Sequence, residues 1–309
     1  MRANLSTCPN LKKIRINSAL AYMQIIHPLA DMTHWSREVI ASGKTLALVP
    51  TMGYFHEGHL SLMRLAGRLA DQVVVSLFVN SLQFGPNEDF SKYPRNLARD
   101  ARMAENADVD ILFVPTAEGM YSPDFNTRVR VGGITDTLCG KQRPGHFEGV
   151  TTVVAKLFNI IKPHYAVFGQ KDFQQLSVIR KMVRDLNWDI EIVAHPIVRE
   201  DDGLAMSSRN TYLSSEQRRK ALCLFNAIQH AKARFADGVK DAGRLKSEIR
   251  DIISSNSGVS IDYISVVDKD TLWEKEVVDS SSVLALAVRV GATRLIDNCL
   301  MANDSEASN

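Results

Sequence analysis

The chain has 309 residues, 45% of them hydrophobic and 23% charged, which is typical of a globular protein and excludes a largely disordered chain. Its 37 Lys and Arg residues and 35 Asp and Glu residues leave a net charge of +2, so no overall field attracts nucleic acid or an anionic membrane. Charged residues interrupt every hydrophobic run before it reaches the roughly 18 residues that a transmembrane helix needs. The four cysteines form no metal-binding spacing, which favours a reducing compartment, the cytoplasm.

The first 22 residues contain basic side chains and no acidic one. A secretory signal would need an apolar stretch that this segment lacks, and an organellar transit peptide would contain more Arg and Ser. We therefore expect residues 1–22 to be a disordered N-terminal extension, with Met23 as a second candidate start.

From about residue 45, short apolar runs rich in Val and Ile alternate with segments of helical spacing. The runs cover residues 45–51, 73–80, 110–115, 165–169 and 190–196, and the helical segments are marked by Leu60 and Met63, Leu97 and Ala101, Val153 and Leu157, and Leu176 and Ile179. Such runs suit strands buried on both faces, and their alternation with helices predicts a parallel sheet with right-handed crossovers. We expect a Rossmann-like domain over residues 23–197, with its ligands at the carboxyl ends of the strands.

The pattern changes near residue 198. A helix is predicted over residues 214–236, with Ser214 or Ser215 as its N-cap, and a second helix over about 242–254. Strands are predicted over 262–268, 282–290 and 293–298. The sequence therefore indicates a smaller α+β domain over residues 198–309, which follows the Rossmann-like α/β domain.

The segment VPTMGYFHEGHLSLMRLA, residues 49–66, joins a buried strand to a helix through a tight turn at Gly53. The first turn of a helix has free N–H groups and the positive end of the helix dipole, which both favour a phosphate. Gly58 leaves room for a ligand close to the backbone, and His59 can donate a hydrogen bond to a phosphate oxygen whose charge grows. The alternative is that the histidines only cap the helix or pack. A zinc site is excluded, because His56 and His59 have the wrong spacing and no third ligand is evident.

Four further segments follow this one, namely FVNSLQFGPNEDFSKYPR (78–95), RPGHFEGV (143–150), FGQKDFQQL (168–176) and DGLAMSSRNTYL (202–213). Together with PTMGYFHEGH (50–59), and in this order, they resemble the pantothenate synthetases, or pantoate–β-alanine ligases, of the HIGH-motif nucleotidyltransferase superfamily. The resemblance runs from about Met23 to Asn298. It implies that ATP and (R)-pantoate form pantoyl adenylate and release pyrophosphate, with Mg²⁺ on the phosphates. β-Alanine then attacks the acyl carbon to give pantothenate and AMP. The family usually forms homodimers, so the resemblance also implies a homodimer.

The resemblance assigns three stretches of this sequence to ATP and implies that His56, His59 and Lys171 are the catalytic residues. The two histidines would face the phosphates, with His59 as the proton donor, and Lys171 would contact a phosphate. Asp172 would accept from a hydroxyl group or hold the lysine. The loop over residues 206–209 is the counterpart of the KMSKS loop and would close over the triphosphate. The implied ATP-binding residues are Met52, Gly53, Tyr54, Phe55, His56, Glu57, Gly58, His59, Gly169, Gln170, Lys171, Asp172, Val198 through its backbone, Met206, Ser207, Ser208 and Arg209.

The resemblance also assigns residues to the two organic substrates. Gln83 would contact pantoate and β-alanine, Asn80 would help at the β-alanine site, and Gln175 would be the second pantoate-binding glutamine. An amide both donates and accepts, which suits a hydroxyl-bearing substrate, and the alternative for both glutamines is an exposed, solvated amide. Asp89 is a candidate Mg²⁺ ligand, and its alternative is an ordinary acidic loop. The family usually has Glu where this chain has Gln170, which removes one charge beside the phosphate-binding lysine.

Two other function classes fit parts of the sequence. Another nucleotidyltransferase of this fold would use the same histidines but keep the nucleotide in its product, and the paired glutamines favour the ligase. A nucleic-acid-binding protein without catalysis would need a basic face, whereas residues 210–300 mix both signs and no aromatic RNA-binding motif occurs. The sequence therefore predicts an enzyme for the small molecules pantoate, β-alanine and ATP, with no nucleic acid and no membrane as partner.

Overall fold

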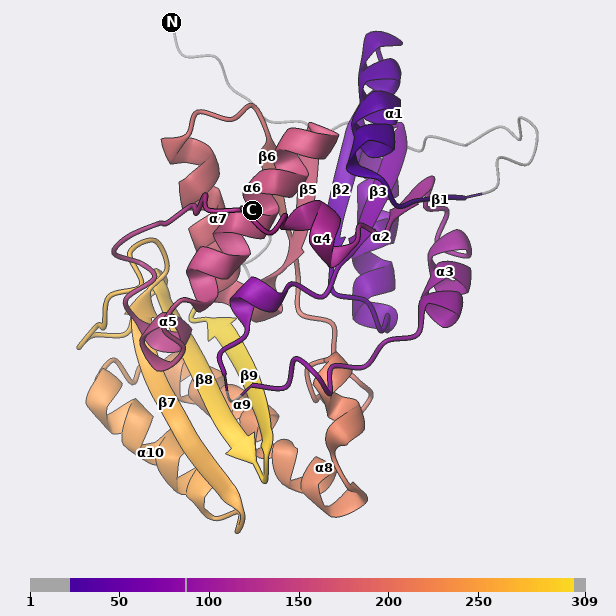
Figure 1. The fold of residues 1–309 in the computed structure, drawn as a ribbon. Coiled ribbons are helices and arrows are strands. Elements are labelled where there is room, and N and C mark those ends of the chain that lie inside the picture. Colours follow the sequence, from indigo (N-terminus) through magenta and orange to yellow (C-terminus); the bar gives the residue numbers. More distant parts are fainter. Residues whose placement is uncertain (1–22, 87, 303–309) are drawn as a thin grey trace, which may run out of the picture.

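A parallel sheet of six strands in the order β1-β4-β3-β2-β5-β6 forms the first part of the chain (Figure 1). Its strands are β1 (Gln24–Ile26), β2 (Leu46–Thr51), β3 (Gln72–Leu77), β4 (Ile111–Phe113), β5 (Tyr165–Gly169) and β6 (Glu191–His195). The computed structural model describes residues 23–86 and 88–302, so the extension predicted over residues 1–22 lies outside the described residues. The five predicted strands of this sheet and the Rossmann-like α/β class are confirmed.

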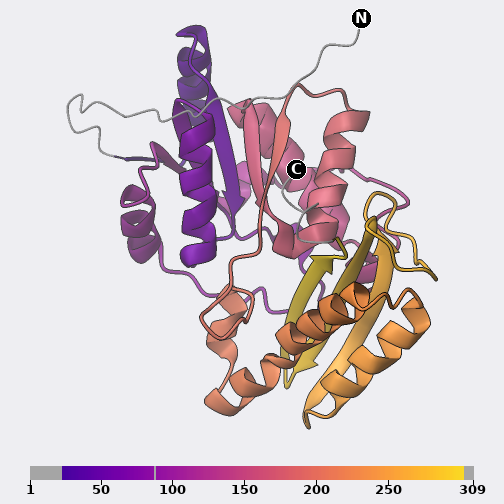
Figure 2. The ribbon, with the colours of Figure 1, turned by 180° about the vertical axis from the view of Figure 1, so that it is seen from behind.

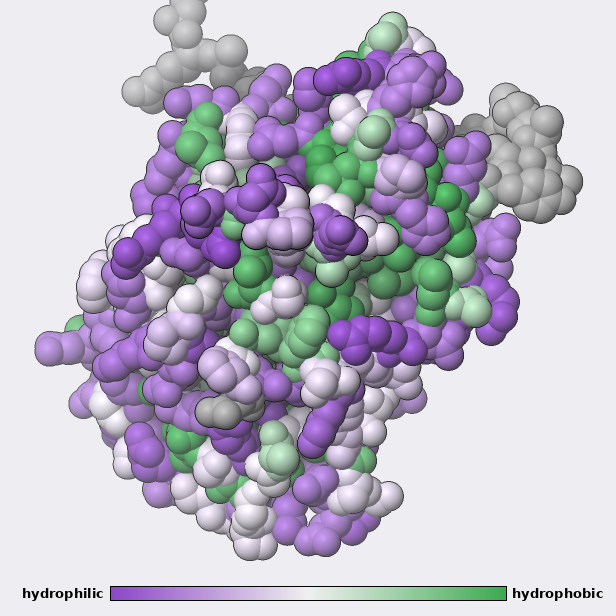
Figure 3. Space-filling view, viewed as in Figure 1, coloured by the Kyte–Doolittle hydropathy of each residue, from purple (hydrophilic) through white to green (hydrophobic). Residues whose placement is uncertain are grey.

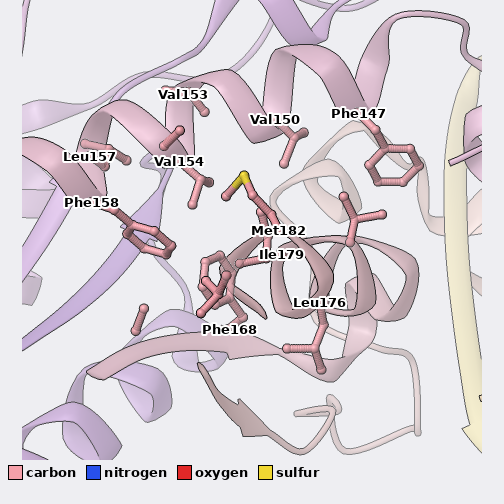
Figure 4. Close-up of a cluster of buried hydrophobic side chains, with 14 of the residues drawn as sticks. Phe147, Val150, Val153, Val154, Leu157, Phe158, Phe168, Leu176, Ile179 and Met182 are labelled. Atoms are coloured by element: carbon pink, nitrogen blue, oxygen red, sulfur yellow. The ribbon is translucent and has the colours of Figure 1, made fainter. Parts of the chain in front are cut away.

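Helices cover both faces of this sheet because the side chains of its strands alternate between two apolar cores. In β2, Leu46 and Leu48 point into one core, and Ala47 and Val49 point into the other. The first core lies under α1 (Leu29–Ala41), α6 (His146–Ile161) and α7 (Phe173–Asp185), and the second lies under α2 (Glu57–Leu69) and α3 (Leu97–Glu105). Figure 4 shows apolar side chains of α6 and α7 gathered around Phe168 of β5. Two short helices, α4 (Ala117–Met120) and α5 (Leu138–Gln142), lie between β4 and α6 in the chain.

The structure corrects the sequence prediction at three places in this first part. Strand β1 and helix α1 were not predicted. The strand expected over residues 73–80 ends at Leu77, because the side chain of Asn80 accepts the N–H of Leu82 at 3.4 Å and caps the 3-10 helix η1 (Ser81–Gln83). Gln83 therefore lies in a helical turn beyond the end of the strand.

The C-terminal part contains an antiparallel sheet of β7 (Val259–Asp268), β8 (Ser282–Val290) and β9 (Thr293–Leu300), as predicted. Helices α9 (Cys223–Ala236) and α10 (Ala242–Ser254) cover one face of it (Figure 2). The helix predicted over 214–236 is instead two helices, because the chain turns at Leu222 between α8 (Ser215–Ala221) and α9. Ser214 is the N-cap of α8, and its side chain accepts the N–H of Gln217.

The surface on the side seen in Figure 1 is mostly polar, with apolar side chains gathered where α1, α4 and the edge strand β1 lie (Figure 3). Within residues 23–86 and 88–302, no helix has both the length and the apolar character to cross a bilayer.

Candidate active site

The predicted site lies where the winding of the parallel sheet reverses. Within the sheet, β3 and β4 lie on one side of strand β2, whereas β5 and β6 lie on the other side of it. The carboxyl ends of β2 and β5 therefore flank the crevice in which open α/β sheets bind ligands. The stretch from Met52 to His59 follows β2 directly, and the 3-10 helix η2 (Gln170–Asp172) follows β5.

The turn after β2 is held by Asp100 of α3, a residue that the sequence analysis did not single out. Gly53 and Tyr54 have positive φ values of 83° and 53°, a region that only glycine adopts without strain. The buried carboxylate of Asp100 accepts the backbone N–H of Tyr54 at 2.6 Å and that of Phe55 at 2.8 Å. Arg99 donates to the carbonyl oxygen of Phe55 at 2.8 Å. The first turn of α3 thereby fixes the loop that leads to the histidines.

His56 and His59 lie side by side at the start of α2, with ring centroids 4.1 Å apart. The backbone N–H of His56 donates to Nδ1 of His59 at 3.3 Å. Gly58 makes room for this pair, because a Cβ atom there would lie 2.9 Å from the ring of His56. The space beside Gly58 is thus occupied by the imidazole of His56, and the close approach of a ligand to the backbone at Gly58 stays a prediction.

Both histidines are held in the neutral form. Burial, together with the positive charges of Lys171 and Arg99, lowers the pKa of His56 from its ordinary value of 6.5 to about 4. Burial also lowers the pKa of His59 well below 6.5, and the neighbouring His56 and Lys171 act in the same direction. Before any ligand enters, each ring therefore carries a single N–H group at neutral pH.

Gln83 is fixed through both its side chain and its backbone. Its side-chain oxygen accepts from Nδ2 of Asn80 at 3.0 Å, and its Nε2 lies 3.3 Å from the sulfur of Met52. Its carbonyl oxygen accepts from Arg143 at 3.3 Å and contacts Nδ1 of His146 at 2.8 Å. The amide of Gln83 is thus held in one orientation at the cavity wall.

Asn80 is almost fully buried, and its contacts account for its whole side chain. Its Nδ2 also donates to the carbonyl oxygen of Gly149 at 3.0 Å, and its Oδ1 accepts from the hydroxyl of Tyr121 at 2.7 Å. These contacts give Asn80 the task of orienting Gln83. Its direct contact with β-alanine stays a prediction.

The adjacent glutamines Gln174 and Gln175 follow the second ATP stretch, residues 169–172, and have different surroundings. Gln174 is buried and bonds to backbone atoms of Ile134, Thr137 and Cys139, so it supports the fold. Gln175, which the sequence analysis selected, lines the cavity together with Lys171. Within the described part of the chain, no ion pair is found for Lys171.

The third stretch follows β6 and carries Ser207, Ser208 and Arg209. The hydroxyl of Ser208 donates to the carbonyl oxygen of Tyr54 at 3.3 Å, which brings this loop against the first stretch. Arg209 binds both carboxylate oxygens of Asp89, with distances of 2.9 and 2.8 Å. The Asp89 carboxylate is therefore engaged by an arginine. Among residues 23–86 and 88–302, no group of three His, Cys, Asp or Glu side chains is placed to hold a metal ion.

Most of the predicted residues meet at one cavity of about 250 Å³. It is lined by Met52, His56, Gly58, His59, Asn80, Gln83, Gly169, Lys171, Asp172, Gln175, Val198, Met206, Ser207, Ser208 and Arg209. A larger cavity of about 930 Å³ adjoins it toward β9 and shares Lys171, Gln175 and Arg209 with it. The combined space lies between the parallel sheet and the C-terminal sheet.

Some predicted ATP-binding residues do not line this cavity. The side chain of Phe55 is buried in the core under α2, and Glu57 is exposed and paired with Arg64. Gly53, Tyr54 and Gln170 are also outside its lining, and Asp89 lines only the larger cavity. Gly53, Tyr54, Phe55, Glu57 and Gln170 therefore belong to the same chain segments as the lining residues but do not themselves face the cavity.

We expect acid to weaken the fold partly through His146. Burial and the nearby charge of Arg143 lower its pKa from 6.5 to about 4. The unfolded chain therefore binds a proton on this side chain at a higher pH than the folded protein, so its contribution to stability is complete above 6.5 and is lost as the pH falls toward 4. Urea unfolding of the wild type and of His146→Gln at about pH 7 and about pH 4.5 measures this. The variant should lose less free energy of unfolding over this range, and equal losses would contradict the assignment.

Known proteins resemble the chain over most of its length. A family model described as pantoate-beta-alanine ligase matches residues 24–300. The chain is 54% identical over 282 residues to a pantothenate synthetase of Geobacter sulfurreducens, covering 91% of this chain and 100% of that protein. It is 51% identical over 279 residues to one of Thermotoga petrophila, with coverages of 90% and 100%.

Two solved structures have the same fold. A pantothenate synthetase from Thermus thermophilus matches with a TM-score of 0.86 at 41% identity, covering 91% of this chain and 100% of that chain. A pantoate-beta-alanine ligase from Francisella tularensis, complexed with beta-gamma ATP and beta-alanine, matches with a TM-score of 0.75 at 32% identity, covering 90% and 98%. The expected family is thereby confirmed. The chain belongs to the pantoate–β-alanine ligases, the pantothenate synthetases.

Proposed function

We propose that the chain forms pantothenate in two steps at the cavity between the two sheets, through a pantoyl-adenylate intermediate. In the first step a carboxylate oxygen of pantoate attacks the α-phosphorus of ATP, and the bond to the bridging oxygen breaks to release pyrophosphate. In the second step the amine of β-alanine attacks the acyl carbon, the bond to the phosphate oxygen breaks, and AMP and a proton leave. The observation that carries the proposal is that one cavity is lined by possible phosphate-binding residues together with two glutamines. These residues are His56, His59, Lys171 and Ser207, and the glutamines are Gln83 and Gln175.

The first step needs charge stabilisation more than it needs a nucleophile of the enzyme. Negative charge grows on the phosphate oxygens as the bond to pyrophosphate breaks, and positioned donors lower the energy of this state. We assign this task to Lys171 and to the two histidines.

The contact of His59 with His56 supports one particular way in which His59 would act. Its Nδ1 accepts the N–H of His56, so the hydrogen of the neutral ring lies on Nε2. We propose that this Nε2–H donates a hydrogen bond to a phosphate oxygen. The family role of proton donor would require an imidazolium, which the low pKa of His59 disfavours.

Gln83 and Gln175 would bind pantoate. Both amides line the cavity, and Gln83 is held by Asn80 so that its orientation does not have to change when the substrate enters. A fixed amide beside the reacting carboxylate keeps it in line with the phosphorus. The relative from Francisella tularensis is complexed with beta-gamma ATP and beta-alanine, which supports a shared site for nucleotide and amine.

Mg²⁺ would enter with ATP as part of the substrate. The described residues lack a carboxylate cluster of their own, and Mg²⁺ is often bound through substrate phosphates with few protein ligands. Asp89 would have to leave Arg209 to serve as such a ligand. We further propose that residues 23–197 bind ATP and pantoate and that residues 198–309 close over ATP. A homodimer in the cytoplasm stays the expectation from the family.

Nucleotide analysis tests this function. The purified chain is incubated with ATP, Mg²⁺ and pantoate, with and without β-alanine, and the nucleotides are separated. We expect AMP and pyrophosphate in equal amounts to accumulate over many turnovers only when both organic substrates are present. ADP would show a phosphotransferase, and AMP without any need for pantoate would rule out the adenylate.

A further inference from the structure

Two adjacent residues of β9 contact the nucleotide stretches from the C-terminal sheet. Asn298 is buried, and its Nδ2 donates to the carbonyl oxygens of Gln170 at 3.0 Å and Lys171 at 2.9 Å. The side-chain amide can lie in one orientation only, because the flipped amide would place its oxygen Oδ1 against two carbonyl oxygens that cannot donate a hydrogen bond. The second stretch is thus held through its backbone by a residue more than a hundred positions away in the chain.

Asp297 connects β9 to the third stretch. Its buried carboxylate binds the guanidinium of Arg199 through two bonds, at 2.7 and 3.0 Å. Arg199 also donates to the carbonyl oxygen of Gly203 at 3.0 Å, across the turn that leads to Met206. At the base of this turn, the N–H of Met206 donates to the carbonyl oxygen of Val198 at 2.9 Å.

We propose that Asp297 and Asn298 are a positioning pair that sets the distance between the second and third ATP stretches. Asn298 fixes the backbone from which Lys171 extends, and Asp297 fixes, through Arg199, the turn that presents the 206–209 loop. Because the two residues are neighbours on one strand, a single rigid element aligns both groups that would contact the phosphates. This inference rests on the proposed binding of ATP to these stretches.

The alternative is that the pair only ties β9 to the rest of the fold. A fold contact alone would change the fraction of folded enzyme, and this alters the maximal rate but not the KM for ATP of the molecules that remain folded. A positioning role changes the KM for ATP and leaves the KM for pantoate unchanged. The proposed pantoate-binding residues are Gln83 and Gln175, and among the described residues neither has a hydrogen bond to β9. The two roles therefore differ in a measurable quantity.

The test uses Asn298→Asp, which keeps the shape but turns a carboxylate oxygen toward the two carbonyl oxygens. Asn298→Ala is the second variant, because it removes the donor without burying a charge. Asn226→Asp is the matched control, since Asn226 is exposed on α9. Pantoate-dependent exchange of pyrophosphate into ATP is measured with ATP and pantoate varied in turn, together with the midpoint of thermal unfolding.

We expect the KM for ATP to rise about tenfold in Asn298→Asp and about threefold to tenfold in Asn298→Ala, with the KM for pantoate unchanged, from the loss of two hydrogen bonds. An unchanged KM for ATP in both variants, or an equal rise in both KM values, would overturn the positioning role. Lys171→Ala is measured in parallel. If it raises the KM for ATP while the Asn298 variants do not, only the pair is wrong; if none of them does, ATP does not bind at residues 169–172 and both proposals fall.

Discussion

Replacing His59 by alanine should lower the rate of adenylate formation by about 10²- to 10³-fold. This is the usual loss when an enzyme loses one hydrogen-bond donor to an oxygen on which negative charge develops. The ring is neutral and its Nε2–H is the group available to a phosphate oxygen. The rate is measured as pantoate-dependent exchange of pyrophosphate into ATP, at saturating ATP. The negative charge of ATP beside the rings would raise the pKa of the histidines, so the exchange is followed over a range of pH.

Two further variants make this prediction sharp. His59→Gln places an amide N–H near the position of Nε2, so it should recover part of the rate if His59 donates a hydrogen bond. An amide cannot release a proton, so a His59→Gln enzyme as slow as the alanine variant would instead support the proton donor of the family. His34→Ala, on the exposed face of α1, is the control and should keep the wild-type rate.

Replacing Lys171 by alanine should raise the KM for ATP by about 10- to 100-fold, since hydrogen bonds between charged groups contribute about 1.5–3 kcal/mol. It should also raise the pKa of His56 from about 4 toward 6.5, because the ammonium group of Lys171 is one of the charges that lower it. Steady-state kinetics measures the first effect, and NMR titration of the histidine ring protons measures the second.

The matched control is Lys181→Ala on α7, whose side chain pairs with Asp185 at 2.8 Å and is absent from the cavity lining. It should leave both the KM for ATP and the His56 titration as in the wild type. A Lys171→Ala enzyme with a wild-type KM for ATP would remove Lys171 from the phosphate site. An unmoved His56 titration would show that the ammonium lies farther from the ring than the structure places it.

The fold was predictable where one periodic pattern filled a whole element. The apolar runs that became β2, β3 and β5 are largely buried on both faces, so their composition alone marks them, whereas β6 is a partly exposed edge strand. Strand β1 is as short as β4, but two of its three residues are exposed and one of them is Gln24, so no buried apolar run marks it. The break between α8 and α9 at Leu222 was missed because residues 214–220 are all polar and give no apolar spacing that could reveal a change of direction. Leu222 also keeps right-handed helical φ and ψ values, and the capping box at Ser214 marks only the start.

The site was predictable where its residues stand together in the chain. His56 and His59 share one helical turn, and Lys171 follows a short buried strand. Asp100, Tyr121 and Asn298 were missed, because each acts through hydrogen bonds with a segment far away in the sequence. Only the tertiary structure brings these supporting side chains to the motifs.

The clamp of Asp100 on the turn at Tyr54 determines when conformational entropy is lost. Ordering a backbone residue costs about 1–2 kcal/mol at room temperature. In this protein the turn is held by a carboxylate of the chain itself, so that the entropy is lost during folding and not during binding. For the proposed ATP site, affinity would thus be gained at the expense of the free energy of unfolding, and a loosened turn would reverse this exchange.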